Sequence, residues 1–192
     1  MNKDIQMNYD EYTGYTINDV RDLLKSHAGQ LTHAVVMHTD IRQRPLKQGQ
    51  FQFRDEISTQ LSQNAIDSVK KKLRFFNNRF CYELYGRKSK RPSTLFRPII
   101  ISTIEGTRLA NDDINCHINL ALGNIPDGID LRASIERCWL KAGGMNIRHK
   151  QKITSLSNKK LYVEPIIDAN NWLDYITKDG ISSWLPEHTM WS

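Results

Sequence analysis

The stretch between residues 112 and 126 holds the side chains best suited to chemistry. Residues 114–122 alternate in type as a β-strand does, so one face carries only isoleucine, cysteine and leucine. The other face carries His117 and Asn119, whose imidazole and amide groups lie two residues apart and can converge on a cation. This spacing favours a metal site, and the competing interpretation is a polar strand surface that simply faces solvent.

A second candidate lies in residues 171–178, which end in a Tyr-x-x-Lys pair. The 100° step of a helix would place its apolar residues on one side as an anchor: Trp172, Leu173 and Ile176. Tyr175 and Lys178 are three residues apart and would project together from the opposite side. Such a pair arises by chance in most proteins of this size, so its meaning depends on its surroundings.

Length and composition narrow the class of protein. The 192 residues are enough for one domain with a single core, and the formal net charge of +6 favours a polyanionic partner, nucleic acid first. The cysteines at positions 81, 116 and 138 have no paired spacing, which argues against disulfides or a zinc cluster and indicates a reducing compartment. No apolar run is long enough to span a membrane and the first ten residues are unlike a signal peptide, so we expect a cytoplasmic protein without membrane contact.

Hydrophobic periodicity predicts an α+β fold. Strands are expected at residues 31–40, 96–105, 114–122 and 161–167, and helices at residues 57–80, 130–141 and 169–180, after a short helix that Thr16 begins. From the first strand this order is βαββαβ plus a final helix. It corresponds to the ferredoxin-like plan, an antiparallel sheet with helices on one face and an open face that the final helix could cross. Residues 1–15 should form a flexible N-terminal arm, and residues 16–192 one domain.

The second and third strands should pair as an antiparallel hairpin, because the polar residues between them turn the chain back. Glu105 then lies near the turn end of this hairpin. This position makes Glu105 a candidate third ligand, although a glutamate at a strand end is usually solvated.

Positive charge is concentrated in three segments, at residues 41–53, 86–92 and 145–159. Their candidates for contact with nucleic-acid phosphates are Arg42, Arg44, Lys47, Arg87, Lys88, Lys90, Arg91, Arg148 and Lys150. The alternative is that these residues are only solvated. The segment at residues 86–92 has four cations in seven residues, cannot bury them, and should be an exposed loop.

The order of these features resembles that of HUH-type single-strand endonucleases, and among them the rolling-circle replication initiators of filamentous phages and small plasmids. The resemblance rests on His38-Thr39-Asp40 at the end of the first strand, on residues 116–120, and on residues 172–180. In architecture it covers residues 31–180. The motifs are short, and their specificity comes from their order.

This resemblance implies roles for the candidate residues. His117, Asn119 and Glu105 would bind a divalent metal, Mg or Mn, with Asn119 standing where the family usually has a second histidine. Tyr175 would be the nucleophile. Lys178 would position the phosphate or neutralise its charge.

The function implied is that of a metal-dependent endonuclease and strand transferase. It would nick and join single-stranded or hairpin DNA through a 5′-phosphotyrosine intermediate and so initiate rolling-circle replication of a phage, plasmid or mobile element. A host helicase and polymerase would complete the process. Two alternatives stay open: a non-catalytic nucleic-acid-binding module on the same fold, and a transcription regulator or host-targeting factor of a mobile element.

Overall fold

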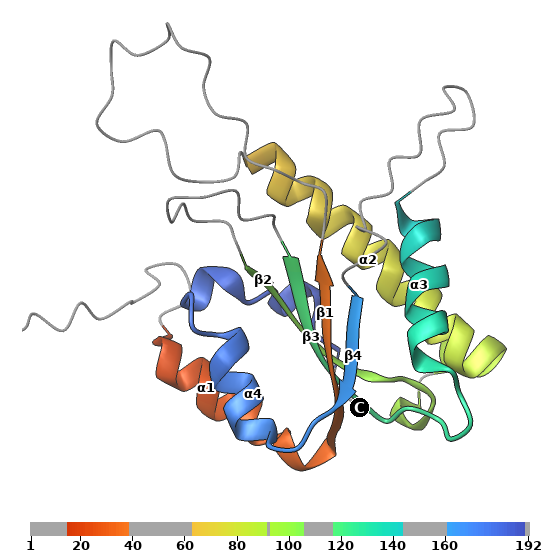
Figure 1. Ribbon diagram of the computed structural model, residues 1–192, viewed down its shortest axis with the longest axis horizontal. Helices are drawn as coiled ribbons and strands as arrows, with labels where there is room; N and C mark the ends of the chain where they lie inside the picture. The colour runs from red at the N-terminus through yellow and green to blue at the C-terminus, as the bar shows by residue number, and fades with distance from the viewer. Residues whose placement is uncertain (1–14, 39–62, 92, 106–116, 144–160, 191–192) are drawn as a thin grey trace, which may run out of the picture.

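Four strands form one antiparallel sheet with helices on both of its faces (Figure 1). The computed structural model describes residues 15–38, 63–91, 93–105, 117–143 and 161–190. The strands are β1 (Leu31–His38), β2 (Ile99–Glu105), β3 (His117–Gly123) and β4 (Leu161–Pro165). Their order across the sheet is β2-β3-β1-β4, and each pair of neighbours is antiparallel. The expected hairpin of β2 and β3 is confirmed, with Glu105 opposite His117 in the register.

Two long helices, α2 (Gln63–Tyr85) and α3 (Leu131–Ala142), cover one face of the sheet. Hydrophobic periodicity predicted an apolar stripe on α2, and its members Val69, Leu73 and Phe76 are buried; Phe80 continues it one turn further. Phe76 stacks on Phe80 and meets the edge of Trp139 from α3. Asp130 caps α3 by accepting a hydrogen bond from the backbone N–H of Ala133.

The other face is covered by α1 (Ile17–Lys25) and α4 (Ala169–Ile176), which lie side by side (Figure 1). These helices and the strands beneath them share a second apolar cluster: Val20, Leu24, Leu31, Ile99, Ile101, Ala121, Leu173 and Ile176. The sequence predicted helices on one face and a final helix that could cross the other, but it did not predict that α1 packs beside α4 there. Strands β2 and β3 carry apolar side chains on both sides, and the second side also has to be shielded from water.

The chain after α4 returns along the outer edge of β2. It contains two short 3₁₀ helices, Ile181–Ser183 and Pro186–His188. Isolated bridges join Trp184 to Thr103 and Met190 to Ile100, and the Leu185 N–H donates to the Ser102 carbonyl at 3.0 Å. The edge of β2 is therefore partly paired by residues 184–190.

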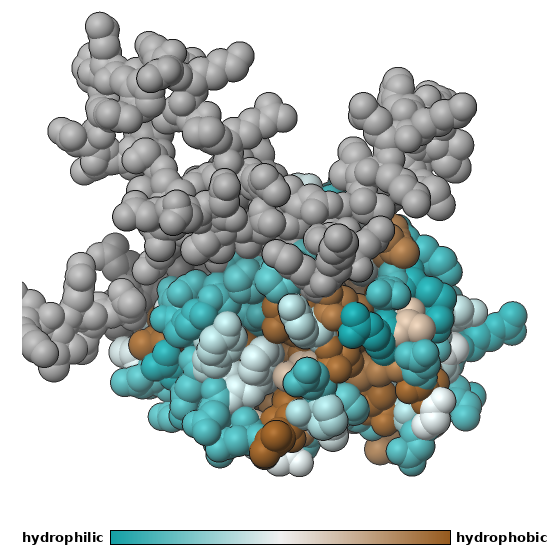
Figure 2. Space-filling view, in the orientation of Figure 1, coloured by the Kyte–Doolittle hydropathy of each residue, from teal (hydrophilic) through white to brown (hydrophobic). Residues whose placement is uncertain are grey.

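The β4 edge of the sheet lies between the two helix pairs (Figure 1). Figure 2 shows hydrophobic surface over the region of β1 and β4, with hydrophilic surface to either side. Tyr162 of β4 is exposed there as part of the edge strand. Among the described residues, no helix is both long and apolar enough to cross a membrane.

Several boundaries differ from the sequence prediction. Helix α2 continues to Tyr85 rather than Phe80, while α4 ends at Ile176 and β4 at Pro165. The predicted basic loop after α2 is a 3₁₀ helix, η2 (Gly86–Lys90). Outside the described residues lie most of the predicted arm, the start predicted for α2, the turn of the hairpin, and the basic candidates Arg42, Arg44, Lys47, Arg148 and Lys150.

Candidate functional site

The candidate site begins where β2 ends and β3 starts. One oxygen of Glu105, Oε2, lies 2.7 Å from Nε2 of His117 and accepts a hydrogen bond from Nδ2 of Asn119 at 3.0 Å. Glu105 faces His117 across the ladder, and Asn119 follows two residues later, so all three side chains project from the same face of the sheet. This is the face that α1 and α4 cover.

These polar groups are shielded from solvent. The side chains of Glu105 and His117 are only 14% and 13% exposed, and Asn119 is fully buried. The alternation that placed His117 and Asn119 on one face was correct. Because α4 packs over β3, this face is not the solvent-facing surface that the competing interpretation required. The buried Oδ1 of Asn119 has no hydrogen-bond partner among the described residues, which is unusual for a buried polar atom.

Lys178 connects this cluster to Tyr175. Its ammonium group forms an ion pair with Oε1 of Glu105 and lies 4.0 Å from the centre of the Tyr175 ring. Lys178 is not on the helix as predicted, because α4 ends two residues earlier. The Tyr175 carbonyl accepts from the Lys178 N–H at 3.2 Å, so the turn beyond the helix keeps the two residues together.

The charges of the cluster stabilise one another. Burial alone would raise the pKa of Glu105, but hydrogen bonds from His117, Lys178 and Asn119 lower this pKa to about 2. Burial would lower the pKa of Lys178, and the hydrogen bond and charge of Glu105 outweigh it, so this pKa is raised. Glu105 is therefore an anion and Lys178 a cation throughout the physiological pH range.

The Tyr175 ring is held in place and still reaches solvent. It stacks on Trp172 with 5.4 Å between ring centres and 19° between ring planes. The Trp172 indole N–H donates to the Leu120 carbonyl of β3 at 3.3 Å, which fixes the stack to the sheet. Tyr175 itself is 46% exposed. A nucleophile for a large substrate needs this combination of a fixed ring and solvent access.

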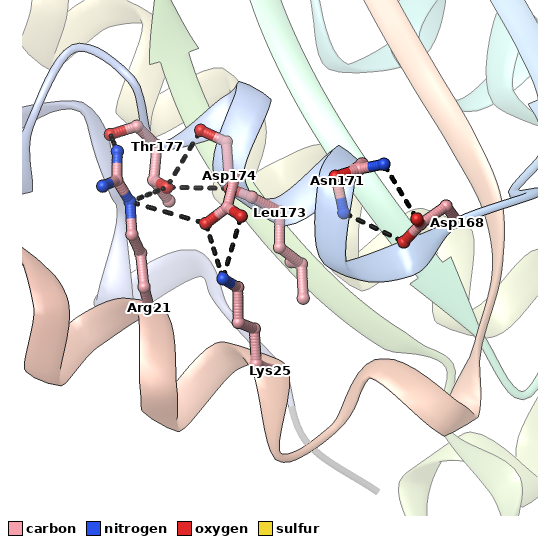
Figure 3. Close-up of polar contacts among 7 residues, drawn as sticks. All are labelled: Arg21, Lys25, Asp168, Asn171, Leu173, Asp174 and Thr177. Atoms are coloured by element: carbon pink, nitrogen blue, oxygen red, sulfur yellow. Dashed lines mark hydrogen bonds and ion pairs between the residues drawn. The ribbon is translucent and has the colours of Figure 1, made fainter.

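Helix α1 anchors the end of α4 (Figure 3). The Lys25 ammonium lies 2.8 Å from the carboxylate of Asp174. The Arg21 guanidinium donates to the side-chain oxygen of Thr177 at 3.0 Å and to its carbonyl at 3.3 Å. The buried Thr177 hydroxyl in turn donates to Leu173 at 2.7 Å. Arg21 and Lys25 thus fix the turn that lies between Tyr175 and Lys178.

Sequence reasoning missed these two cations. Arg21 and Lys25 are four residues apart on one side of α1, which is a visible signal, but Thr177 is 156 positions from Arg21 in the chain. It also gave no role to His38, whose ring stacks on that of His117 at 5.1 Å between centres and meets the edge of Tyr162 at 5.9 Å. His38 faces His117 across β1 and β3, so this stack follows from the register.

Glu105, His117 and Asn119 fit a hard divalent cation. One carboxylate, one imidazole and one amide lie together. The amide faces Glu105 with its Nδ2, so its buried Oδ1 would reach a shared ion only after the amide turns over. Within the described segments, no three His, Cys, Asp or Glu side chains gather closely enough to hold a metal. Among the described residues, the third donor of such a site would be the amide of Asn119.

The structure does not bring the basic candidates at residues 87–91 to this cluster. They lie in η2, before β2 begins at Ile99, whereas the cluster forms where β2 ends at Glu105 (Figure 1). Seven residues in a strand place the two ends of β2 about 20 Å apart. These basic residues are therefore not part of the cluster around Tyr175.

The structure thus groups Tyr175, Lys178, Glu105, His117 and Asn119, all five predicted for catalysis or metal binding. In comparisons with known proteins, no protein-family model, no curated protein and no solved structure matches the chain. The functional argument therefore rests on the chemistry of the site.

Proposed function

We propose that this chain is an HUH-type endonuclease that nicks and rejoins single-stranded DNA through Tyr175. The observation that carries the proposal is an unbroken series of contacts from the Tyr175 ring to the Lys178 ammonium, to the Glu105 carboxylate and to the His117 imidazole. This series joins residues from α4, the turn after it and two strands of the sheet. Groups so far apart in sequence meet at one place, as an active site requires.

The architecture supports the same proposal. Helix α2 links β1 to β2, and α3 links β3 to β4, with the strand order β2-β3-β1-β4. This arrangement supports a ferredoxin-like βαββαβ plan, with α4 as the tyrosine-bearing helix. On this plan, the nick would provide a 3′-hydroxyl end from which rolling-circle replication of a phage, plasmid or mobile element can start.

In the reaction we propose, the phenolic oxygen of Tyr175 attacks the phosphorus of one phosphodiester. The bond from phosphorus to the 3′-oxygen breaks, the phenol loses its proton to solvent, and the released 3′-oxygen takes a proton from water. The product is a 5′-phosphotyrosine ester, and the reverse attack by a 3′-hydroxyl rejoins the strand.

The residues around Tyr175 favour this attack. The Lys178 ammonium, 4.0 Å from the ring centre, stabilises the negative charge that the phenol oxygen acquires. The Glu105 carboxylate holds both Lys178 and His117 in position. Glu105, His117 and Asn119 would hold Mg or Mn, which when bound supplies positive charge to the scissile phosphate.

A covalent adduct assay tests the proposal. The wild type and Tyr175→Phe are incubated with a pool of labelled random-sequence single strands and manganese, and denaturing gels reveal labelled protein. We expect adducts from the wild type and none from Tyr175→Phe. Tyr82→Phe is the matched control, because Tyr82 is also about half exposed but lies on α2, away from the cluster. His117→Ala should abolish cleavage while DNA affinity stays within several-fold.

The second candidate is a nucleic-acid-binding module without catalysis. It is favoured by one observation, that Lys178 already supplies a positive charge to Glu105, so the cluster is neutralised by the protein's own residues. Equal DNA binding by the wild type and Tyr175→Phe, with no adduct from either protein, would support this candidate and exclude the nuclease.

A further inference from the structure

A concentration of positive charge in the described part of the chain lies away from the site described above. We call it the η2 basic surface, made up of Arg87, Lys88, Lys90 and Arg91. All four residues are exposed, and none forms an ion pair with a carboxylate in the segments that the structure describes. Four cations within five residues repel one another, which favours binding of a polyanion.

The backbone beneath this surface is fixed in place. Gly86 has a φ of 57°, a left-handed conformation that suits glycine and lets the chain leave α2 directly into η2. The Ser89 hydroxyl donates to the Gly86 carbonyl at 2.8 Å, and the Arg91 N–H donates to the Lys88 carbonyl at 3.0 Å. The cations therefore project from a defined turn rather than from a loop without internal hydrogen bonds.

The nearby aromatic ring is in contact with the cations themselves. Lys88 and Arg91 both lie over the Phe96 ring, at 5.4 and 5.9 Å from its centre, and Tyr85 meets it edge to face. Proteins that bind single strands usually combine positive charge with open aromatic faces. Here the ring supports the cations, and what remains exposed is suited to phosphates alone.

We propose that the η2 basic surface binds the phosphate backbone of duplex DNA next to the single strand held at Tyr175. This inference rests on the proposed function. The surface precedes β2 and the site lies at its far end, and β2 alone is about 20 Å long, which corresponds to about six base pairs of duplex. The DNA recognised thus includes a paired stem or flank of at least that length, bound without regard to its sequence.

The test compares two labelled DNAs by fluorescence anisotropy over a range of salt concentrations. One is a single strand, and the other is the same strand continued into a duplex longer than six base pairs. The variant is Arg87→Gln with Lys90→Gln, because neither side chain makes a hydrogen bond or ring contact that its loss would break within the described residues. The control, Lys71→Gln with Lys141→Gln, removes the same charge from exposed positions on α2 and α3.

We expect the wild type to bind the duplex-containing DNA more tightly than the single strand. In the η2 variant, affinity for the duplex-containing DNA should fall several-fold, while affinity for the single strand stays unchanged. Two lost phosphate contacts should reduce the slope of log affinity against log salt by about 1.8 for the duplex-containing DNA. Lys88→Gln with Arg91→Gln provides a second variant with the same expectation. An unchanged ratio of the two affinities and an unchanged slope in both variants would overturn the proposal.

The result is independent of cleavage. If no protein forms an adduct with DNA, the proposed nuclease fails, yet the ratio of affinities still reports on the η2 basic surface. If adducts form and the ratio does not respond to either variant, the duplex contact alone fails. Equal loss of affinity for both DNAs would show a general charge effect and would also contradict a duplex-specific surface.

Discussion

Replacement of Glu105 by glutamine should destabilise the fold by removing the anion that holds three partners. The pKa of Glu105 in the folded protein is about 2, against a usual 4.5. The difference of about 2.5 pKa units corresponds to about 3 kcal/mol of preference for the ionised form in the folded state. Because the side chain is only 14% exposed, solvent screening removes little of this energy. We expect Glu105→Gln to lower the free energy of unfolding at pH 7 by up to about 3 kcal/mol.

The sign of the pH dependence follows from the direction of the shift. A lowered pKa in the folded state means that the stabilisation is fully present above pH 4.5 and is lost as the pH falls towards 2. The difference between the wild type and Glu105→Gln should therefore decrease by about half or more by pH 3. Urea unfolding followed by tryptophan fluorescence, with EDTA present to remove metal ions, measures both quantities.

Two comparisons isolate the effect of the cluster. Glu136→Gln changes the same group at an exposed position on α3 and should leave stability unchanged. A double-mutant cycle with Lys178→Gln should give a coupling of only about 1 kcal/mol, since Lys178 is 42% exposed and its ion pair is screened. If Glu105→Gln were as stable as Glu136→Gln at pH 7, the assignment of Glu105 as a buried, stabilising anion would be refuted.

Three further changes test other parts of the structure. Arg21→Ala removes the hydrogen bonds to Thr177, so it should lower the free energy of unfolding by about 1 to 2 kcal/mol and slow adduct formation, whereas Asp22→Ala at an exposed neighbouring position should do neither. An unchanged rate of adduct formation in Arg21→Ala would show that α1 does not position the site. Burial lowers the pKa of His188, so as the pH falls below the usual histidine pKa of 6.5 the unfolded chain gains a proton there and the folded protein does not; the free energy of unfolding should therefore decrease. Urea unfolding of His188→Gln over the same pH range would contradict this if the variant kept the full pH dependence of the wild type. Gly123→Ala should cost about 1 to 3 kcal/mol, because its Cβ would overlap the Gln30 carbonyl oxygen, while Gly29→Ala meets nothing nearby; thermal unfolding of the two variants should differ accordingly.

The parts of the fold that sequence could predict are those set by local spacing. The stripe from Val69 to Phe80 fixed which side of α2 is buried, and the alternation from His117 to Asn119 correctly placed both on one face. The three-residue step from Tyr175 to Lys178 also brought these side chains together, even though Lys178 lies beyond the helix.

What sequence could not predict depends on contacts between distant segments. Asn119 is buried because α4 lies across β3. The sheet face that carries Asn119 is fully covered only because α1 packs beside α4. Neither periodicity nor charge in a single segment contains that information, because each helix is equally amphipathic on an open or a covered sheet. The same holds for the ion pair of Glu105 with Lys178, whose partners come from β2 and from the turn after α4.

The bridges from Trp184 to Thr103 and from Met190 to Ile100 have a consequence for how copies of this molecule meet. An outermost strand with unsatisfied amides recruits the same strand from a neighbour and so seeds assembly. Because residues 184–190 already pair with the outer edge of β2, the segment that follows the proposed nucleophile also prevents a second copy from adding a strand along this edge of the sheet.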